Sequence, residues 1–160
     1  MRGIKLLLFI VGIGWISLAV CLGMFEMLRY FGFFDVALSA GYPIQDLTIA
    51  FFSLVFIRAF IEELFFRFTP LILAYRFGKK VLRHPIVAVV AMVIISSIHF
   101  GYLHGGFKHV FVQGIGGIFF SLVFLKCGGL KRDYGRAILS SSLAHFVYNA
   151  TLFTLEFLLR

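Results

Sequence analysis

Two adjacent glutamates and two arginines lie within one of the most apolar stretches of this sequence, RAFIEELFFRF at 58–68. On a helix, Arg58 and Glu62 are four residues apart, as are Glu63 and Arg67, so each carboxylate can pair with an arginine. A charge at the centre of a membrane helix costs roughly 2.5 to 3.5 kcal/mol on insertion scales, so these groups need partners, water or a function. Adjacent residues lie about 100° apart around a helix axis, so the two pairs point in different directions and other helices must surround them.

Further polar side chains that could do chemistry occur in other apolar segments. His99 follows MVIISSI, while His145 and Asn149 are four residues apart in HFVYN and therefore share a helix face. Counted from the predicted cytoplasmic ends at about 1.5 Å per residue, Glu62 lies about 22 Å deep and His99 about 20 Å deep. A single membrane histidine usually forms a hydrogen bond between helices, but this set can satisfy its members together in one wet cavity.

The elements that must position these groups are membrane helices. The 160-residue chain is 61% hydrophobic and 14% charged, with a mean hydropathy of +1.02, well outside the soluble range. Because about 20 apolar residues cross a hydrocarbon core, we predict an all-α polytopic bundle with five spans at about 5–28, 47–77, 86–103, 109–126 and 137–158. The spans form a single membrane domain over residues 1–160, and no internal repeat divides it. The second span is too long for one straight crossing, and Pro70 predicts a break in its second half.

The connections between the spans predict their orientation. Basic residues concentrate on one side, where they are Arg2, Lys5, Arg76, Lys79, Lys80, Arg83, Lys126, Lys131, Arg132 and Arg136. The opposite side has only Arg29, Lys108 and Arg160. The positive-inside rule therefore predicts a multi-pass protein of the cell membrane with a cytoplasmic N-terminus and an external C-terminus. Because the basic residues are scattered between apolar runs, nucleic acid is not an expected partner.

Short motifs in three of these spans resemble those of a known family. EELFFR at 62–67 matches an EExxxR motif, a FxxxH motif is met by Ile95 and His99 with isoleucine in place of phenylalanine, and HxxxN is met by His145 and Asn149. In this order they resemble the CPBP or Abi family of membrane-embedded proteases, related to the Rce1-type CAAX prenyl endopeptidase. The resemblance covers about 46–157, with one preceding helix at about 5–28, so the chain resembles a short version of the family.

The resemblance implies a glutamate-type endopeptidase that cleaves a membrane-associated or lipidated protein or peptide. It implies that Glu62 activates water, that His99 helps to position or polarise that water, and that His145 and Asn149 stabilise the oxyanion. Glu63 and Arg67 would shape the site. The bilayer and the substrate are the expected partners, and a second copy or a membrane partner is a candidate for walls that a short chain lacks.

Two other interpretations stay open at this stage. Glu62, His99 and His145 are residue types that can hold zinc, although no HExxH helix is present and we favour a site without a cofactor. The polar cluster could also serve a non-catalytic membrane binding or immunity factor, which should tolerate Glu62→Gln. His104 and His109, near the outer end of the third span, are expected to lie at the membrane interface, and Gly114 to Gly117 predict close helix packing.

Overall fold

The computed structural model describes residues 3–34 and 47–159, and within them it is a helical bundle without strands. The predicted all-α membrane bundle is therefore confirmed as a fold class. In chain order the elements are α1 (Ile4–Tyr30), α2 (Ile49–Glu63), the π-helix η1 (Leu64–Phe68), α3 (Thr69–Phe77), the π-helix η2 (Gly78–Leu82), α4 (Pro85–Leu103), α5 (Phe107–Val110), α6 (Gln113–Cys127), the 3-10 helix η3 (Gly129–Lys131) and α7 (Tyr134–Leu158). Arg2, Asp46 and Arg160, used in the predictions of topology and core extent, lie outside the described residues.

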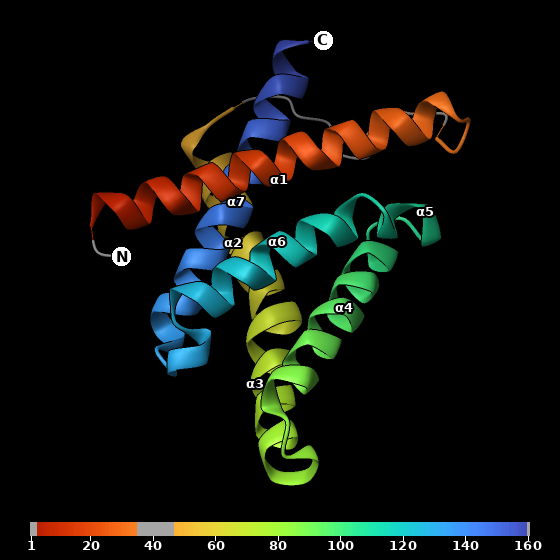
Figure 1. Cartoon of the computed structure of the whole chain (residues 1–160). Helices are drawn as coiled ribbons and strands as arrows, with labels where there is room; N and C mark the ends of the chain where they lie inside the picture. Colours follow the sequence, from red (N-terminus) through yellow and green to blue (C-terminus); the bar gives the residue numbers. More distant parts are fainter. Residues whose placement is uncertain (1–2, 35–46, 160) are drawn as a thin grey trace.

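The helices are arranged around α6 and α7. Figure 1 shows α3 and α4 as a hairpin joined through η2, with α6 returning from the far end of α4 across the molecule. α7 packs against α1, α2 and α6, and α4 packs against α3 and α6. α1 lies across α6 and α7, so the helix that precedes the charged span covers one side of the helices that follow it (Figure 1).

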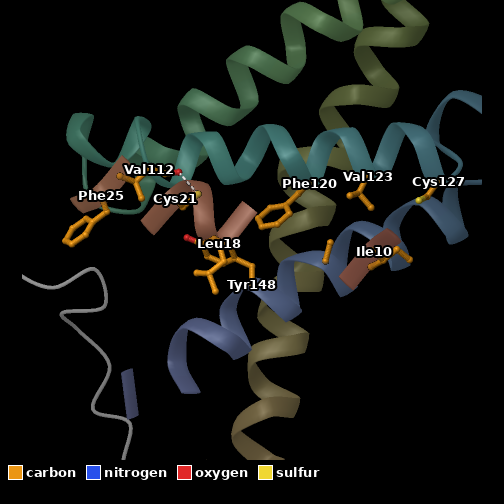
Figure 2. Packing of buried hydrophobic residues seen from close by; sticks show 10 residues of the cluster. Ile10, Leu18, Cys21, Phe25, Val112, Phe120, Val123, Cys127 and Tyr148 are labelled. Atoms are coloured by element: carbon orange, nitrogen blue, oxygen red, sulfur yellow. Dashed lines mark hydrogen bonds between the residues drawn. The ribbon is translucent and has the colours of Figure 1, made fainter. Parts of the chain in front are cut away.

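Among the described residues, the buried apolar side chains form two clusters. The larger one joins α1 to α6 and α7 (Figure 2). Cys21 is fully buried there and donates a hydrogen bond from Sγ to the Val112 carbonyl at 3.2 Å. Gly14 makes the closest approach, because a Cβ on it would lie 2.7 Å from the Ala144 carbonyl oxygen of α7. The backbones of α1 and α7 can therefore meet only where α1 lacks a side chain.

The small residues of α6 confirm the predicted close packing. A Cβ on Gly114 would lie 3.0 Å from the Ser97 carbonyl oxygen, and one on Gly117 would lie 3.2 Å from Ser97 Oγ. A Cβ on Gly101 of α4 would lie 2.6 Å from the Cα of Val110 in α5. Glycines therefore bring α4 and α6 close enough for their polar side chains to share one interior.

The predicted spans agree with the structure to different degrees. Within the described residues, three segments are long and apolar enough to cross a membrane: Ile4–Tyr30, Pro85–Leu103 and Phe107–Lys131. The first two coincide with the predicted spans at 5–28 and 86–103. The third contains the predicted span at 109–126, although its helix is interrupted at 111–112, between α5 and α6. The predicted span at 137–158 lies within α7, and the number of crossings stays a prediction.

The predicted break near Pro70 takes the form of a widened helical turn. Leu64–Phe68 is π-helical, and both the backbone N–H and the side-chain hydroxyl of Thr69 bond to the Leu64 carbonyl, the latter at 3.0 Å. Proline cannot donate to the carbonyl four residues earlier and its ring clashes with it, so the turn before Pro70 cannot remain regular α-helix. The helix continues as α3 instead of ending, and the widened turn carries Arg67.

Candidate active site

Glu62, in the last turn of α2, is surrounded by three basic or titratable side chains. Arg58 donates from Nε to Glu62 Oε1 at 2.8 Å. The other carboxylate oxygen, Oε2, lies 3.6 Å from His145 Nε2 and 3.7 Å from His104 Nε2. With 14% of its side chain exposed, Glu62 is positioned at the edge of the bundle interior, where a small molecule such as water can reach it.

Glu63, the neighbouring carboxylate, is fully buried and has different partners. Its Oε1 lies 3.2 Å from Arg67 Nη1 and 3.0 Å from His145 Nδ1. The Arg67 guanidinium, 1% exposed, also lies over the Phe100 ring at 4.3 Å from its centroid. The adjacent glutamates thus point to different groups, as their separation of about 100° around a helix predicts.

His145 is held in one orientation by contacts on both its edge and its face. A carboxylate can only accept a hydrogen bond, so Glu63 fixes the proton of His145 on Nδ1 and turns Nε2 toward Glu62. Phe120 of α6 stacks on the imidazole with a centroid distance of 4.4 Å and an interplanar angle of 18°. Phe100 of α4 meets the same ring edge-on at 5.7 Å. The ring plane is therefore defined by two neighbouring helices.

His104, to which the sequence assigned no catalytic role, is a histidine that lies next to Glu62, while the role predicted for His99 stays a prediction. His99 is exposed on α4 and packs edge-on against Phe66, and no ion pair joins it to Glu62 in the described part of the chain. His104, expected at the membrane interface, is only 23% exposed and faces Glu62, while its Nδ1 lies 2.7 Å from the Phe100 carbonyl. The signal was present in the sequence, because FGYLH at 100–104 is an intact FxxxH.

Asn149 lies one helical turn beyond His145 on α7 and is half-buried. It forms no hydrogen bond with any residue that the structure describes. Its side-chain amide is therefore available to bind a substrate group. This is compatible with the predicted role of Asn149 in stabilising the oxyanion, which stays a prediction.

An apolar groove runs past Glu62. It has a volume of about 450 Å³ and lies between α4 and the chain from α2 to the start of α3; its lining is Ile61, Glu62, Phe65, Phe66, Pro70, Met92, Ile95, Ser96 and His99. Most of these side chains are hydrocarbon or aromatic, and Glu62 is the carboxylate among them. A largely apolar ligand could therefore lie beside the Glu62 carboxylate, with His99 at the groove wall.

The zinc alternative named Glu62, His99 and His145 as ligands. Among the residues that the structure describes, no three histidine, cysteine or acidic side chains are grouped so that they could hold a metal ion. His99 lines the same groove as Glu62, and His145 has Nδ1 on Glu63 and Nε2 toward Glu62. The dependence of the site on a metal stays a prediction to be tested.

The chain matches a model of a known protein family. A family model described as type II CAAX prenyl endopeptidase, Rce1-like, matches residues 44–151, which include α2 through most of α7 and every side chain of the cluster around Glu62. The searches found no matching curated protein and no matching solved structure.

Proposed function

Because the chain belongs to the Rce1-like family of type II CAAX prenyl endopeptidases, we propose that it is an intramembrane endopeptidase in which Glu62 activates the attacking water. One observation carries the proposal: a partly exposed carboxylate at the edge of an apolar groove faces Nε2 of both His104 and His145. A base, two imidazoles and a site for an extended apolar substrate are thereby combined in one place.

The proposed reaction assigns a role to each of these groups. Glu62 accepts a proton from water, the water oxygen adds to the scissile carbonyl carbon, and the carbonyl electron pair moves onto oxygen. His104, whose Nε2 lies 3.7 Å from Glu62 Oε2, helps to position this water. When His145 carries both ring protons, Nδ1–H stays on Glu63 and Nε2–H donates to the oxyanion, together with the Asn149 amide. Collapse breaks the C–N bond, and Glu62 returns its proton to the leaving nitrogen.

Glu63 and Arg67 support the reaction without taking part in proton transfer. Their buried ion pair, at 3.2 Å, anchors the carboxylate that orients His145. A substrate that is membrane-associated or lipidated suits the groove, since its Ile61, Phe65 and Ile95 walls favour a hydrocarbon chain or an apolar helix.

The test is a comparison of protein N-termini and C-termini in membranes from cells that carry the wild type or Glu62→Gln at equal expression. Specific ends should form with the wild type and disappear in the variant, because glutamine keeps the shape and removes the base. Glu26→Gln is the matched control: Glu26 pairs with Arg29 in α1, is 55% exposed and lies outside the cluster. If Glu62→Gln leaves the profile unchanged, catalysis by Glu62 is excluded and a peptide-binding or immunity role replaces it.

Metal dependence has its own test. We propose a reaction without a metal, so cleavage by the purified protein should continue after dialysis against a chelator and should not rise on addition of Zn²⁺. Loss of the Glu62-dependent cleavage on chelation, with recovery on addition of Zn²⁺ alone, would establish the zinc alternative.

A further inference from the structure

A second cavity, remote from Glu62, is built almost entirely from cations and tyrosines. It has a volume of about 490 Å³ and is lined by Tyr75, Arg76, Lys79, Lys80, Arg132 and Tyr134. It shares no lining residue with the groove beside Glu62. Figure 1 shows the elements that form it, the end of α3 with η2 and the start of α7, on the same side of the molecule.

The orientation of the protein in the membrane does not explain why these cations lie around one cavity. The positive-inside rule places basic residues in the connections, but it does not bring those of two connections to one hollow. Here Arg76, Lys79 and Lys80 come from the end of one hairpin helix, and Arg132 comes from the turn before α7. All four cations are exposed, and an anion bound among them would lower their mutual repulsion.

No carboxylate of the described residues serves as that anion. Asp133, next to Arg132 in sequence, is not part of the lining, and its Oδ1 accepts a hydrogen bond from the Arg136 backbone N–H at 3.4 Å. No ion pair with a described acidic residue involves any of the four cations that line the cavity.

The two tyrosines that line the cavity are held by packing against neighbouring side chains. Tyr134 packs edge-on against Phe68 with a centroid distance of 5.9 Å, and Tyr75 packs against the apolar core formed by α3, α4, α6 and α7. Tyrosine at the end of a membrane helix has its ring at the level of the lipid headgroups. The residues that line the cavity carry guanidinium, ammonium and phenol groups, which are donors that bind the oxygen atoms of a phosphate.

Apolar surface adjoins the cations along the same helix. Leu73 lies one turn before Arg76 and is 57% exposed, and Phe77 lies one turn before Lys80 and is 55% exposed. A ligand with a phosphate and hydrocarbon chains would cover both surfaces at once, whereas a free phosphate would cover only the cations.

We propose that this cavity binds the phosphate of an anionic phospholipid headgroup, with the acyl chains along the exposed apolar face of α3. By the charge distribution this end of the bundle faces the cytoplasm, so the lipid would belong to the inner leaflet. The lipid would join the α3–α4 hairpin to the α6–α7 connection at the base of the bundle.

Two arginines with the same backbone conformation provide a matched test. Arg132 and Arg83 both have left-handed backbones, with φ of 62° and 58°, and both are exposed, but only Arg132 lines the cavity. Glycine adopts this conformation without strain, so Arg132→Gly and Arg83→Gly each remove one charge without a backbone penalty.

Binding of phosphatidylglycerol and phosphatidylcholine to the detergent-solubilised full chain would be measured by native mass spectrometry. Phosphatidylglycerol should bind more tightly than phosphatidylcholine, and Arg132→Gly should weaken it about fivefold, the factor that about 1 kcal/mol per basic residue implies. Arg83→Gly should leave the affinity unchanged. Equal weakening by both substitutions would indicate unspecific surface charge, and no weakening by Arg132→Gly would exclude the cavity as the site; either result overturns the proposal.

A second arm separates a lipid from a soluble anion. Inorganic phosphate is added to the complex with phosphatidylglycerol at increasing concentration. If the lipid is the ligand, phosphate should displace it only weakly, because it lacks the hydrocarbon contacts. Displacement by phosphate at concentrations equal to those of the lipid would show that the cavity takes a free phosphate, and the lipid proposal fails.

Discussion

At the scale of single residues, the proposed reaction depends on the histidine that faces Glu62, which is His104 at the C-terminal end of α4. His104→Gln should lower the rate at which the Glu62-dependent protein ends form by about 10²-fold to 10³-fold, because it removes the group that we propose to position the reacting water. His99→Gln should change that rate by no more than a few-fold, since its ring contacts Phe66 and the groove instead of the carboxylate. The two rates are measured in the same membranes at matched expression. The reverse order of effects would return the water-positioning role to His99.

The buried ion pair makes a separate prediction at this scale. Arg67→Leu should destabilise the fold by about 3 to 5 kcal/mol, because it leaves the fully buried Glu63 carboxylate without its guanidinium partner. Arg29→Leu, which breaks the exposed pair with Glu26, should cost at most about 1 kcal/mol. Thermal unfolding in detergent, followed by circular dichroism, compares the two. Similar melting temperatures for both variants would contradict the structural role of the buried pair.

At the scale of elements, α1 is attached to α7 by a contact that allows no side chain. Gly14→Ala should destabilise the bundle by about 1 to 3 kcal/mol, because the added Cβ would lie 2.7 Å from the Ala144 carbonyl oxygen. Gly12→Ala, on the same helix, meets nothing within 4 Å and should keep or raise the stability, since alanine favours helix more than glycine does. The measurement is the thermal midpoint of each purified variant. Equal midpoints would mean that α1 does not dock as described.

The attachment of α1 has a consequence for the site. Ala144 is next to His145, and Phe120, which stacks on His145, belongs to the same apolar core as Cys21 of α1 (Figure 2). The helix outside the family match therefore supports the face of α6 and α7 that orients the imidazole.

At the scale of the whole molecule, the arrangement of charges predicts topology. A fluorescent protein fused to the N-terminus should fold and fluoresce in the cytoplasm, and an alkaline phosphatase fused to the C-terminus should be active outside, because the predicted five crossings would separate the two ends. Fusion of the phosphatase after Arg83, in the basic connection, is the control and should be inactive. If both ends report the same side, the number of crossings is even and one predicted span does not cross.

The sequence alone determined the features that depend on near neighbours in the chain. Apolar runs predicted the helices, and spacing of four residues predicted the pairs Arg58–Glu62 and Glu63–Arg67, found at 2.8 Å and 3.2 Å. Pro70 predicted a disturbance in the second span, although it could not specify a π-helical turn. These features are local, because helix geometry relates residues a few positions apart without reference to the rest of the chain.

Only the tertiary structure decided which groups from different helices meet. Counting depth along straight, parallel helices placed His99 level with Glu62, but the helices cross one another (Figure 1) and the glycine contacts of α4 with α6 set the rotation of α4. His104 follows His99 by five residues, which turns a helix by about 500° and moves it about 7.5 Å along its axis, so the two histidines point in different directions. The meeting of Arg132 with Arg76, Lys79 and Lys80 was equally outside the reach of the sequence, since it depends on how two connections are placed by packing between helices.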